Sequence, residues 1–301
     1  LISGFHLISF TDQGIYDLVN NLGSTAARLL FSPMEESCHF VFNQCLVRDM
    51  EKDKQDLSLL KDVLRLLRTV LRTCSLVGWI GVTFAQANSC LLLYLYTGPS
   101  LAENKTAVSL LRLFSFYVLL LAWNGSTEAF LNAAMSTNEV ARHNKRLVLF
   151  SIVFLGANGL FVPKLGVHGF VLANCINMIS RISYSCWFIR HYLQRQKNIA
   201  LKDQEPTTSD ATTEASHWLT TAVPLLRLML PSLKEMIVFA LSLAITVASE
   251  KHFCCMLGWK LILIHTGITS FTLLSVLFLL HLEESDLWDL FQTGLGKTKS
   301  E

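Results

Sequence analysis

The sequence predicts an all-α, multi-pass membrane protein, and three observations support this fold class. Of the 301 residues, 51% are apolar and only 16% are charged, whereas about 25% are charged in an ordinary soluble domain. The mean hydropathy of the chain is +0.42. Apolar stretches of about 20 residues, the length that crosses a bilayer as an α-helix, recur along the chain.

The first ten residues, LISGFHLISF, fit the end of a truncated transmembrane helix, and about seven complete helices are expected after it. A turn at 11–14 leads into the first of them. Gly23 and Pro33 permit a kink in that helix, and only Pro163–Gly166 separates the fourth from the fifth, which predicts an antiparallel hairpin. The predicted limits are 15–46, 73–96, 107–134, 146–163, 167–192, 233–249 and 260–281.

The distribution of lysine and arginine predicts which loops face the cytosol. Most of these residues lie in 47–72, 135–145, 193–232 and the tail 282–301, or at the adjacent helix ends. The opposite set of loops carries only Lys105, Lys164, Lys251 and Lys260. That set also contains Asn104-Lys105-Thr106, a glycosylation sequon that is used only on the lumenal side, so charge and sequon predict the same orientation.

The chain is expected to divide into a transmembrane bundle over 11–192, a polar cytosolic linker over 193–232, two trailing helices over 233–281 and the tail 282–301. Within the bundle, residues 56–72 form a basic amphipathic helix with leucine and valine on one face and lysine and arginine on the other. Such a helix is typical of the cytosolic membrane interface, where it favours anionic headgroups. A plain positive-inside anchor is the alternative.

The motifs of soluble enzymes are missing from the sequence. It contains no H-E-x-x-H, no G-x-S-x-G and no G-x-G-x-x-G, and its nine histidines show no metal-ligand spacing. Basic residues are not interleaved with aromatic ones on a polar surface, so nucleic acid is not an expected partner. We therefore expect a protein that is not an enzyme and uses no cofactor or metal.

The informative residues are polar and lie inside the predicted spans, where ionisable groups are costly and indicate function. In 15–46 they recur at steps of three and four, which places them on one helix face that must meet protein or water. These residues are Asp17, Asn20, Asn21, Ser24, Arg28, Ser32, Glu35, Glu36 and His39. The same spacing relates Asn174, Asn177 and Arg181 in 167–192, and Asn124, Glu128 and Asn132 in 107–134.

Arg28 and Arg181 lie near the middle of their spans, and two arginines there suit a phosphate or pyrophosphate, which guanidinium binds in bidentate fashion. A structural interpretation stays open beside this one. Arg28 would then pair with Glu35 or Glu36, Arg181 would pair with Glu128, and the asparagines would form interhelical hydrogen bonds.

Three stretches carry a resemblance to a known family. They are TDQGIYDLVNNLGSTAARLLFSPMEES (11–37), YVLLLAWNGSTEAFLNAAMS (117–136) and GFVLANCINMISRI (169–182). With them the chain resembles the carboxy-terminal half of the Rft family, endoplasmic-reticulum proteins tied to transbilayer movement of the dolichol-pyrophosphate-linked oligosaccharide used in N-glycosylation. The resemblance covers nearly the whole chain and weakens over 198–260. It implies the multidrug/oligosaccharidyl-lipid/polysaccharide exporter fold, two helical bundles around a central cavity, of which this chain is the second bundle plus trailing helices.

The resemblance implies a multi-pass protein of the endoplasmic reticulum that acts as a flippase, with the glycolipid and membrane lipids as partners and no protein partner indicated. Arg28 and Arg181 would receive the pyrophosphate. Sugar hydroxyls would bond to the neighbouring polar groups, which are Asp17, Asn20, Asn21, Glu35, Glu36, Glu128, Asn174 and Asn177. Two alternatives stay open: a non-transporting accessory factor of the same pathway, and a cation-coupled antiporter that uses Asp17, Glu35, Glu36 and Glu128.

Overall fold

A computed structural model of the chain describes residues 9–46, 48, 57–202, 225–253 and 258–284. The described residues form helices and short connections, which confirms the predicted all-α class. They group into two compact units, one made of residues 1–75 and 116–230 and the other of residues 76–115 and 231–301. The long helices α3 (Leu57–Thr97) and α5 (Lys105–Ala134) each contribute one part to each unit.

The first unit begins with α1 (Phe10–Leu30) and α2 (Ser32–Cys45), which together replace the predicted span 15–46. The predicted turn at 11–14 is wrong, because Ser9 caps α1: its hydroxyl accepts a hydrogen bond from the Asp12 amide at 3.1 Å. The predicted kink is confirmed as a break at Phe31, with Pro33 in the first turn of α2. Most of the predicted truncated helix, residues 1–8, lies outside the described residues.

The sequence analysis expected a separate helix at the membrane interface over residues 56–72. In the structure, residues 57–72 do not form a separate helix. They continue directly into the next predicted span as α3, a helix of 41 residues that is about 60 Å long at 1.5 Å per residue. The apolar face is buried in the protein, with Leu60, Val63, Leu67 and Leu71 at most 2% exposed. Other helices of the unit, and not lipid, therefore cover this face.

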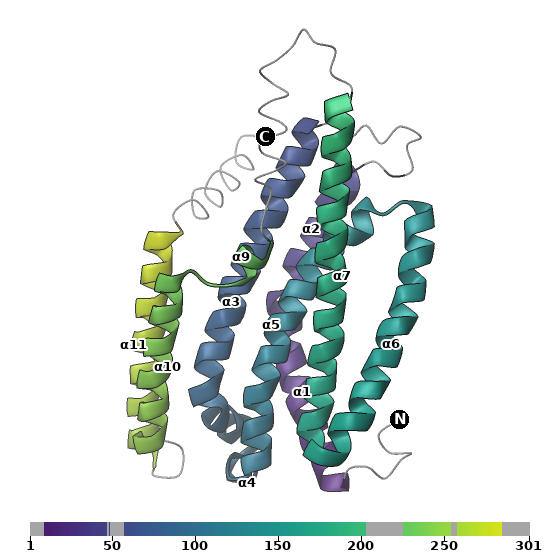
Figure 1. Cartoon of the computed structure of the whole chain (residues 1–301). Coiled ribbons are helices and arrows are strands. Elements are labelled where there is room, and N and C mark those ends of the chain that lie inside the picture. The colour runs from purple at the N-terminus through teal and green to yellow at the C-terminus, as the bar shows by residue number, and fades with distance from the viewer. Residues whose placement is uncertain (1–8, 47, 49–56, 203–224, 254–257, 285–301) are drawn as a thin grey trace. The chain divides into compact units, whose positions relative to one another are not determined.

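The helices α6 (Thr137–Leu165) and α7 (Val167–Lys202) pack side by side as the predicted antiparallel hairpin (Figure 1). Gly166 makes the turn with a φ of 57°, a backbone conformation that favours glycine. A Cβ atom at Gly169 would lie 2.5 Å from the carbonyl carbon of Phe161, so the hairpin needs glycine there. Both helices extend into predicted loops, because a capping box of Ser136 and Glu139 starts α6 early and α7 runs to Lys202.

Aromatic contacts join three elements of the first unit around Phe130 of α5. Its ring lies edge-on to Phe42 of α2 at 5.7 Å and to Tyr192 of α7 at 5.8 Å. The end of α5 is capped by Arg48, whose guanidinium donates to the carbonyls of Asn132 at 2.8 Å and Ala133 at 3.1 Å. The short helix α9 (Leu225–Met229) completes the unit, and the linker residues 203–224 lie outside the described residues.

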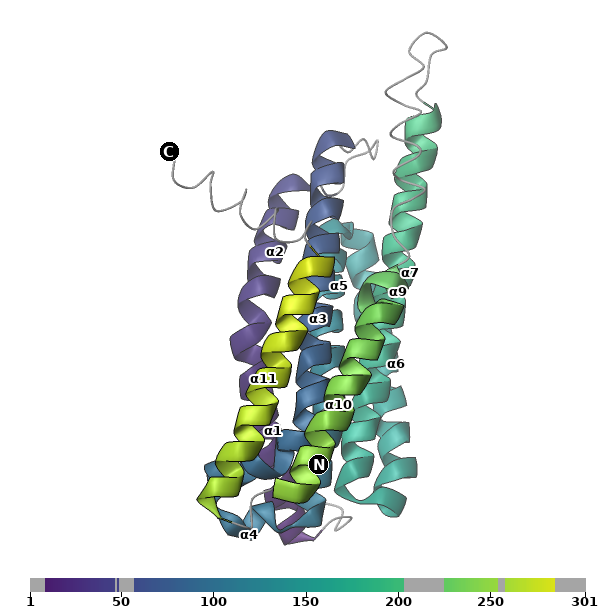
Figure 2. The same ribbon diagram turned by 90° about the vertical axis from the view of Figure 1, so that its left-hand side faces the viewer.

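The second unit contains the later part of α3, the short helix α4 (Pro99–Ala102), the start of α5, and the pair α10 (Leu233–Phe253) and α11 (Trp259–Glu283). Figure 2 shows α10 and α11 next to each other. Leu76, Phe239, Val276 and Leu280 form their buried core. Polar contacts add to it, including a buried Ser249–His265 hydrogen bond at 2.9 Å.

Five described stretches are long and apolar enough to cross a membrane. They are Ser58–Thr97, Lys105–Ala134, Thr137–Leu165, Leu225–Phe253 and Trp259–Glu283. The helices α1, α2 and α7 are not among them, since α2 has only 14 residues and the sequences of α1 and α7 are too polar. The chain is a multi-pass membrane protein, and the polar helices α1, α2 and α7 carry most of the predicted site residues, together with the apolar helix α5.

Candidate functional site

The polar face predicted for α1 is present on one side of the helix. Ile15, Val19, Gly23 and Ala27 are buried, and these four-residue steps define the side of α1 that packs against the rest of its unit. On the other side Asp17, Asn21 and Arg28 are exposed, while Asn20 and Ser24 are half-buried. The hydrogen-bonding groups of this face point away from the bundle that α1 belongs to.

Arg28 bonds only to groups of its own helix among the described residues. Its Nε donates to the Ser24 carbonyl at 3.2 Å, and its Nη2 lies 3.4 Å from the Ser24 hydroxyl and 3.5 Å from the Thr25 hydroxyl. The described structure contains no ion pair between Arg28 and Glu35 or Glu36, so that structural alternative is wrong. The guanidinium is exposed and has no carboxylate to neutralise it in this part of the chain.

Glu35 does not continue the outward face of α1, because the break at Phe31 separates the two helices. Its half-buried side chain turns toward α5, where a Cβ atom at Gly125 would lie 2.8 Å from the Glu35 Cδ atom. A larger residue at 125 would therefore push this carboxylate away. Glu36 is exposed and His39 half-buried, so the single stripe predicted from Asp17 to Glu36 is wrong at its α2 end.

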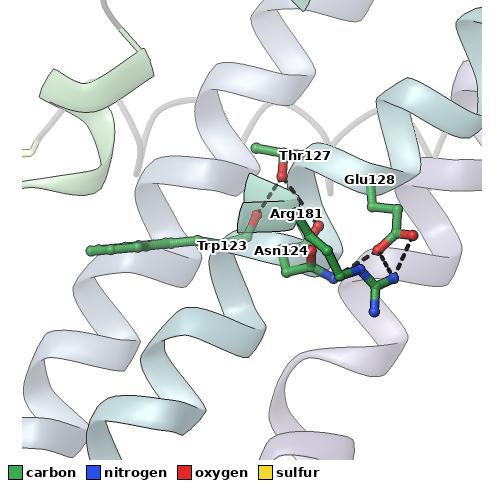
Figure 3. A network of polar contacts seen from close by, with 5 residues as sticks. All are labelled: Trp123, Asn124, Thr127, Glu128 and Arg181. Carbon is green, nitrogen blue, oxygen red and sulfur yellow. Dashed lines mark hydrogen bonds and ion pairs between the residues drawn. The ribbon is translucent and has the colours of Figure 1, made fainter. Parts of the chain in front are cut away.

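Three residues predicted on α5 and α7 meet between these two helices: Asn124, Glu128 and Arg181 (Figure 3). The Arg181 Nη2 atom lies 2.6 Å from each of the two carboxylate oxygens of Glu128, 53 residues earlier in the chain. The Asn124 amide donates to the same carboxylate at 2.7 Å. The ion pair between Arg181 and Glu128, which the sequence analysis kept as a structural alternative, is formed.

The neighbouring residues hold this cluster in place. Trp123 points away from the Glu128 carboxylate in Figure 3, and its indole N–H donates to the Ser75 hydroxyl at 2.8 Å. The Thr127 hydroxyl donates to the carbonyl of Trp123 at 2.8 Å. Both bonds restrict the turn of α5 that presents Asn124 and Glu128, which lie one turn apart on the same face.

The cluster carries an excess of negative charge. Glu35 is close enough to interact electrostatically with both Glu128 and Arg181. Two carboxylates and one guanidinium give a formal charge of −1. Asn124 is buried, and its Oδ1 atom has no hydrogen-bond donor among the described residues, so this oxygen can accept a bond from water or from a hydroxyl group.

The remaining predicted residues lie apart from this cluster, and Asn174 also interacts with the Tyr16 hydroxyl of α1. The Asn174 amide donates to the Phe170 carbonyl of its own helix at 3.1 Å, and both Asn174 and Asn177 are half-buried on α7. Asn104 is the cap of α5: its Oδ1 accepts bonds from the Thr106 amide at 2.9 Å and the Ala107 amide at 3.2 Å. Its use as a glycosylation site stays a prediction.

One ion pair in the second unit was not predicted. Arg112 of α5 and Glu250 of α10 are joined at 2.5 Å. The sequence analysis placed Glu250 in a loop, because it ended the span at 249, whereas α10 continues to Phe253. The sequence did show charged residues near the ends of two apolar helices, which could have indicated an ion pair. The periodicity of a sequence does not, however, predict which helix packs against which.

Comparisons with known proteins agree with the resemblance. The model of a family described as "Rft protein" matches residues 1–291. The chain is 35% identical to the Man(5)GlcNAc(2)-PP-dolichol translocation protein RFT1 of Mus musculus over 294 residues, which are 98% of this chain and 50% of that protein. No solved structure matches the chain.

Relatives of the same name are found in two other organisms. The Drosophila melanogaster protein is 39% identical over 62% of this chain and 33% of its own length, and the Saccharomyces cerevisiae protein is 31% identical over 62% and 32%. The chain spans half or less of the length of these relatives. The match to the family model nevertheless covers almost every residue. The chain therefore belongs to the Rft protein family.

Proposed function

We propose that this chain forms part of a flippase that moves dolichol-pyrophosphate-linked oligosaccharide from the cytosolic to the lumenal leaflet of the endoplasmic reticulum for protein N-glycosylation. The relatives are named as translocation proteins of Man(5)GlcNAc(2)-PP-dolichol. The chain covers about half of the length of the mouse relative, so transport is proposed for a full-length protein of the family.

The observation that carries this proposal is the outward polar face of α1 with an unneutralised arginine on it. A polar helix face within a membrane must meet water or polar groups, since lipid cannot satisfy them. Arg28 offers its guanidinium to a pyrophosphate, which accepts bidentate, charge-assisted bonds. Asp17, Asn20 and Asn21 lie on the same face and can bond to sugar hydroxyls.

Arg181 has a different role in the proposal, because Glu128 already neutralises it. A pyrophosphate reaches Arg181 only by displacing the Glu128 carboxylate, so this arginine exchanges partners between a resting and a loaded state. Asn177 and Asn174 lie one and two turns before Arg181 on α7 and extend the polar surface, while Glu36 adds an exposed carboxylate on α2. The polyprenyl chain stays in the lipid.

A second function, cation coupling, is favoured by one specific observation. Glu35 and Glu128 lie together with a single guanidinium between α2, α5 and α7, and two neighbouring carboxylates are a common arrangement for binding a proton or sodium ion. The two other proposed carriers, Asp17 and Glu36, are exposed and do not join this cluster. Coupling would therefore depend on Glu35 and Glu128.

The test is transport of the lipid-linked oligosaccharide by the full-length protein reconstituted in vesicles, read as accessibility from outside. We compare Arg28→Ala and Arg28→Lys with Arg190→Ala, a control that removes an exposed arginine of α7. Losing two charge-assisted bonds to phosphate weakens binding by about 100-fold. We expect a large rate loss in Arg28→Ala, partial recovery in Arg28→Lys and an unchanged control.

Each other result selects an alternative. If neither the wild-type protein nor any variant moves the lipid, the flippase proposal fails and an accessory factor is supported. Normal rates in both Arg28→Ala and Arg181→Ala would refute the pyrophosphate assignment alone. If the rate follows an imposed pH or sodium gradient and Glu35→Gln abolishes that dependence, the chain belongs to a coupled antiporter.

A further inference from the structure

A hollow of about 110 Å³ lies in the first unit between α6 and α7, at the end of the hairpin away from the Gly166 turn. It involves neither α1 nor the Glu128 cluster. Its wall combines three arginines with a set of aromatic rings, and the residues that matter here are Arg142, Arg146, Tyr184, Trp187, His191 and Arg195. The lysine and arginine distribution predicts that this end faces the cytosol.

The aromatic residues of α7 form a stacked series. The rings of Tyr184 and Trp187 are 5.9 Å apart and nearly parallel, and those of Trp187 and His191 are 5.4 Å apart at an angle of 15°. Steps of three and four residues place all three on one helix face. The Arg146 guanidinium carbon lies 4.5 Å from the centre of the Tyr184 ring and 5.4 Å from that of Trp187.

Stacking of this kind fixes Arg146 without using its hydrogen bonds. A guanidinium group is planar, and its N–H donors point outward in that plane. The two rings attract the charge of the group through a cation–π interaction, which uses none of its N–H donors. Arg146 is therefore held ready for an acceptor that it does not find among the described residues.

The charges of the hollow are not balanced within the described part of the chain. Glu139 is engaged twice, because it accepts bonds from the Ser136 amide at 3.0 Å and from Arg195 at 3.2 Å. It neutralises Arg195. Neither Arg142 nor Arg146 has a carboxylate within ion-pair distance among the described residues. Three arginines and one glutamate give a formal charge of +2, which favours an anion with several acceptor oxygens.

The surface beside the hollow indicates what kind of molecule carries that anion. Within one to two turns after Arg146, α6 exposes Val148, Leu149 and Ile152, and the helix is one of the candidate membrane spans. Trp187 is 52% exposed, and tryptophan prefers the boundary between headgroups and hydrocarbon. A basic hollow therefore adjoins a surface that suits hydrocarbon chains.

We infer that this hollow binds the phosphate headgroup of an anionic membrane lipid, whose hydrocarbon chains lie along the exposed apolar face of α6. Arg142 and Arg146 donate to the phosphate oxygens, and the Trp187 ring packs against the glycerol region. The inference concerns a lipid of the surrounding membrane, so it holds or fails independently of the proposed transport.

The test uses native mass spectrometry of the purified full-length protein with dioleoyl phosphatidic acid, and with dioleoyl phosphatidylcholine as a lipid with the same chains. The double variant Arg142→Gln/Arg146→Gln is compared with Lys145→Gln/Arg190→Gln, which also removes two positive charges, from exposed positions of α6 and α7. Each lost charge-assisted bond weakens binding about tenfold. We expect phosphatidic acid occupancy to fall in the first double variant only.

Arg142→Gln alone provides a second measurement, because Arg142 is exposed and its loss leaves the stacked rings in place. We expect it to weaken phosphatidic acid binding about tenfold while the protein stays folded. Three results would overturn the inference: equal losses in the two double variants, equal affinity for the two lipids, or full displacement of the lipid by millimolar inorganic phosphate. The last result would identify the site as one for free phosphate.

Discussion

Replacing Glu128 with glutamine tests whether its ion pair with Arg181 holds α5 to α7. The substitution preserves the length and shape of the side chain but removes its charge. Arg181 then loses the carboxylate whose two oxygens lie 2.6 Å from its Nη2 atom, and Asn124 loses a charged acceptor at 2.7 Å. The carbonyl oxygen of the new amide side chain can still accept one bond, so the perturbation reports mainly on charge.

Two reference values limit the size of the effect. A hydrogen bond to a charged group contributes about 1.5–3 kcal/mol in a folded protein. Interhelical hydrogen bonds in a membrane average only about 0.6 kcal/mol and reach about 1.7 kcal/mol, because the separated helices find other partners. The side chains of Arg181 and Glu128 are 28% and 17% exposed. For this charged but not fully buried pair we expect a coupling free energy of about 1–2 kcal/mol.

The assay is a double-mutant cycle on the unfolding free energy of the full-length protein in mixed micelles, followed by tryptophan fluorescence. The cycle combines Glu128→Gln, Arg181→Gln and the double variant. Glu36→Gln is the control, since Glu36 is an exposed glutamate of α2 and surface substitutions change stability by less than about 0.5 kcal/mol.

The reasoning predicts that each single variant is destabilised and that the double variant loses less than the sum. Additivity within about 0.5 kcal/mol would refute it, because uncoupled residues behave in that way. A loss in Glu128→Gln no larger than in the Glu36→Gln control would also refute it. Either result would mean that Arg181 is free in the resting protein and available to a pyrophosphate without exchange.

Two further predictions concern the hairpin and the sequon. Gly169→Ala should destabilise the protein by about 1–3 kcal/mol, since overpacking carries that cost and the new Cβ meets the Phe161 backbone. Gly159→Ala in α6, where nothing lies within 4 Å of the added atom, should be neutral or stabilising in the same unfolding assay, and equal losses would contradict the close contact. Thr106→Ala should abolish a glycosidase-sensitive mass shift while Asn104 keeps its capping bonds to the amides of residues 106 and 107. A shift that persists in this variant would show that another site is glycosylated.

The polar face of α1 is a feature that sequence reasoning predicted well. Side chains three and four residues apart lie on one side of any α-helix, so the grouping of Asp17, Asn20, Asn21 and Arg28 follows from spacing alone. The spacing rule fails beyond Phe31, because it assumes one straight helix. The proline at 33 signalled a kink, but the direction in which Glu35 points after the break depends on the packing of α2 against Gly125.

The helix 57–97 shows a different limit. The alternation of apolar and basic residues in 57–72 correctly predicted an amphipathic helix with a leucine-rich face. Periodicity indicates that the apolar face is shielded from water. Hydropathy alone does not distinguish whether lipid or protein shields it. Only the fold shows that Leu60, Leu67 and Leu71 pack against neighbouring helices.

The sequence by itself determined that the chain is an all-helical membrane protein, where most helices lie, and that their polar groups are concentrated on α1, α5 and α7. These properties depend on local composition and on the helical repeat, which are the same in any environment. The tertiary structure decided which charges meet: Arg181 pairs with Glu128 across 53 residues, and Arg28 and Arg146 have no acidic partner among the described residues. Such pairing depends on how helices distant in sequence pack together. The sequence could therefore name Arg28 and Arg181 as candidates for a pyrophosphate, but only the folded chain shows that Arg181 is neutralised, that Arg28 is not, and that Arg142 and Arg146 line a separate hollow.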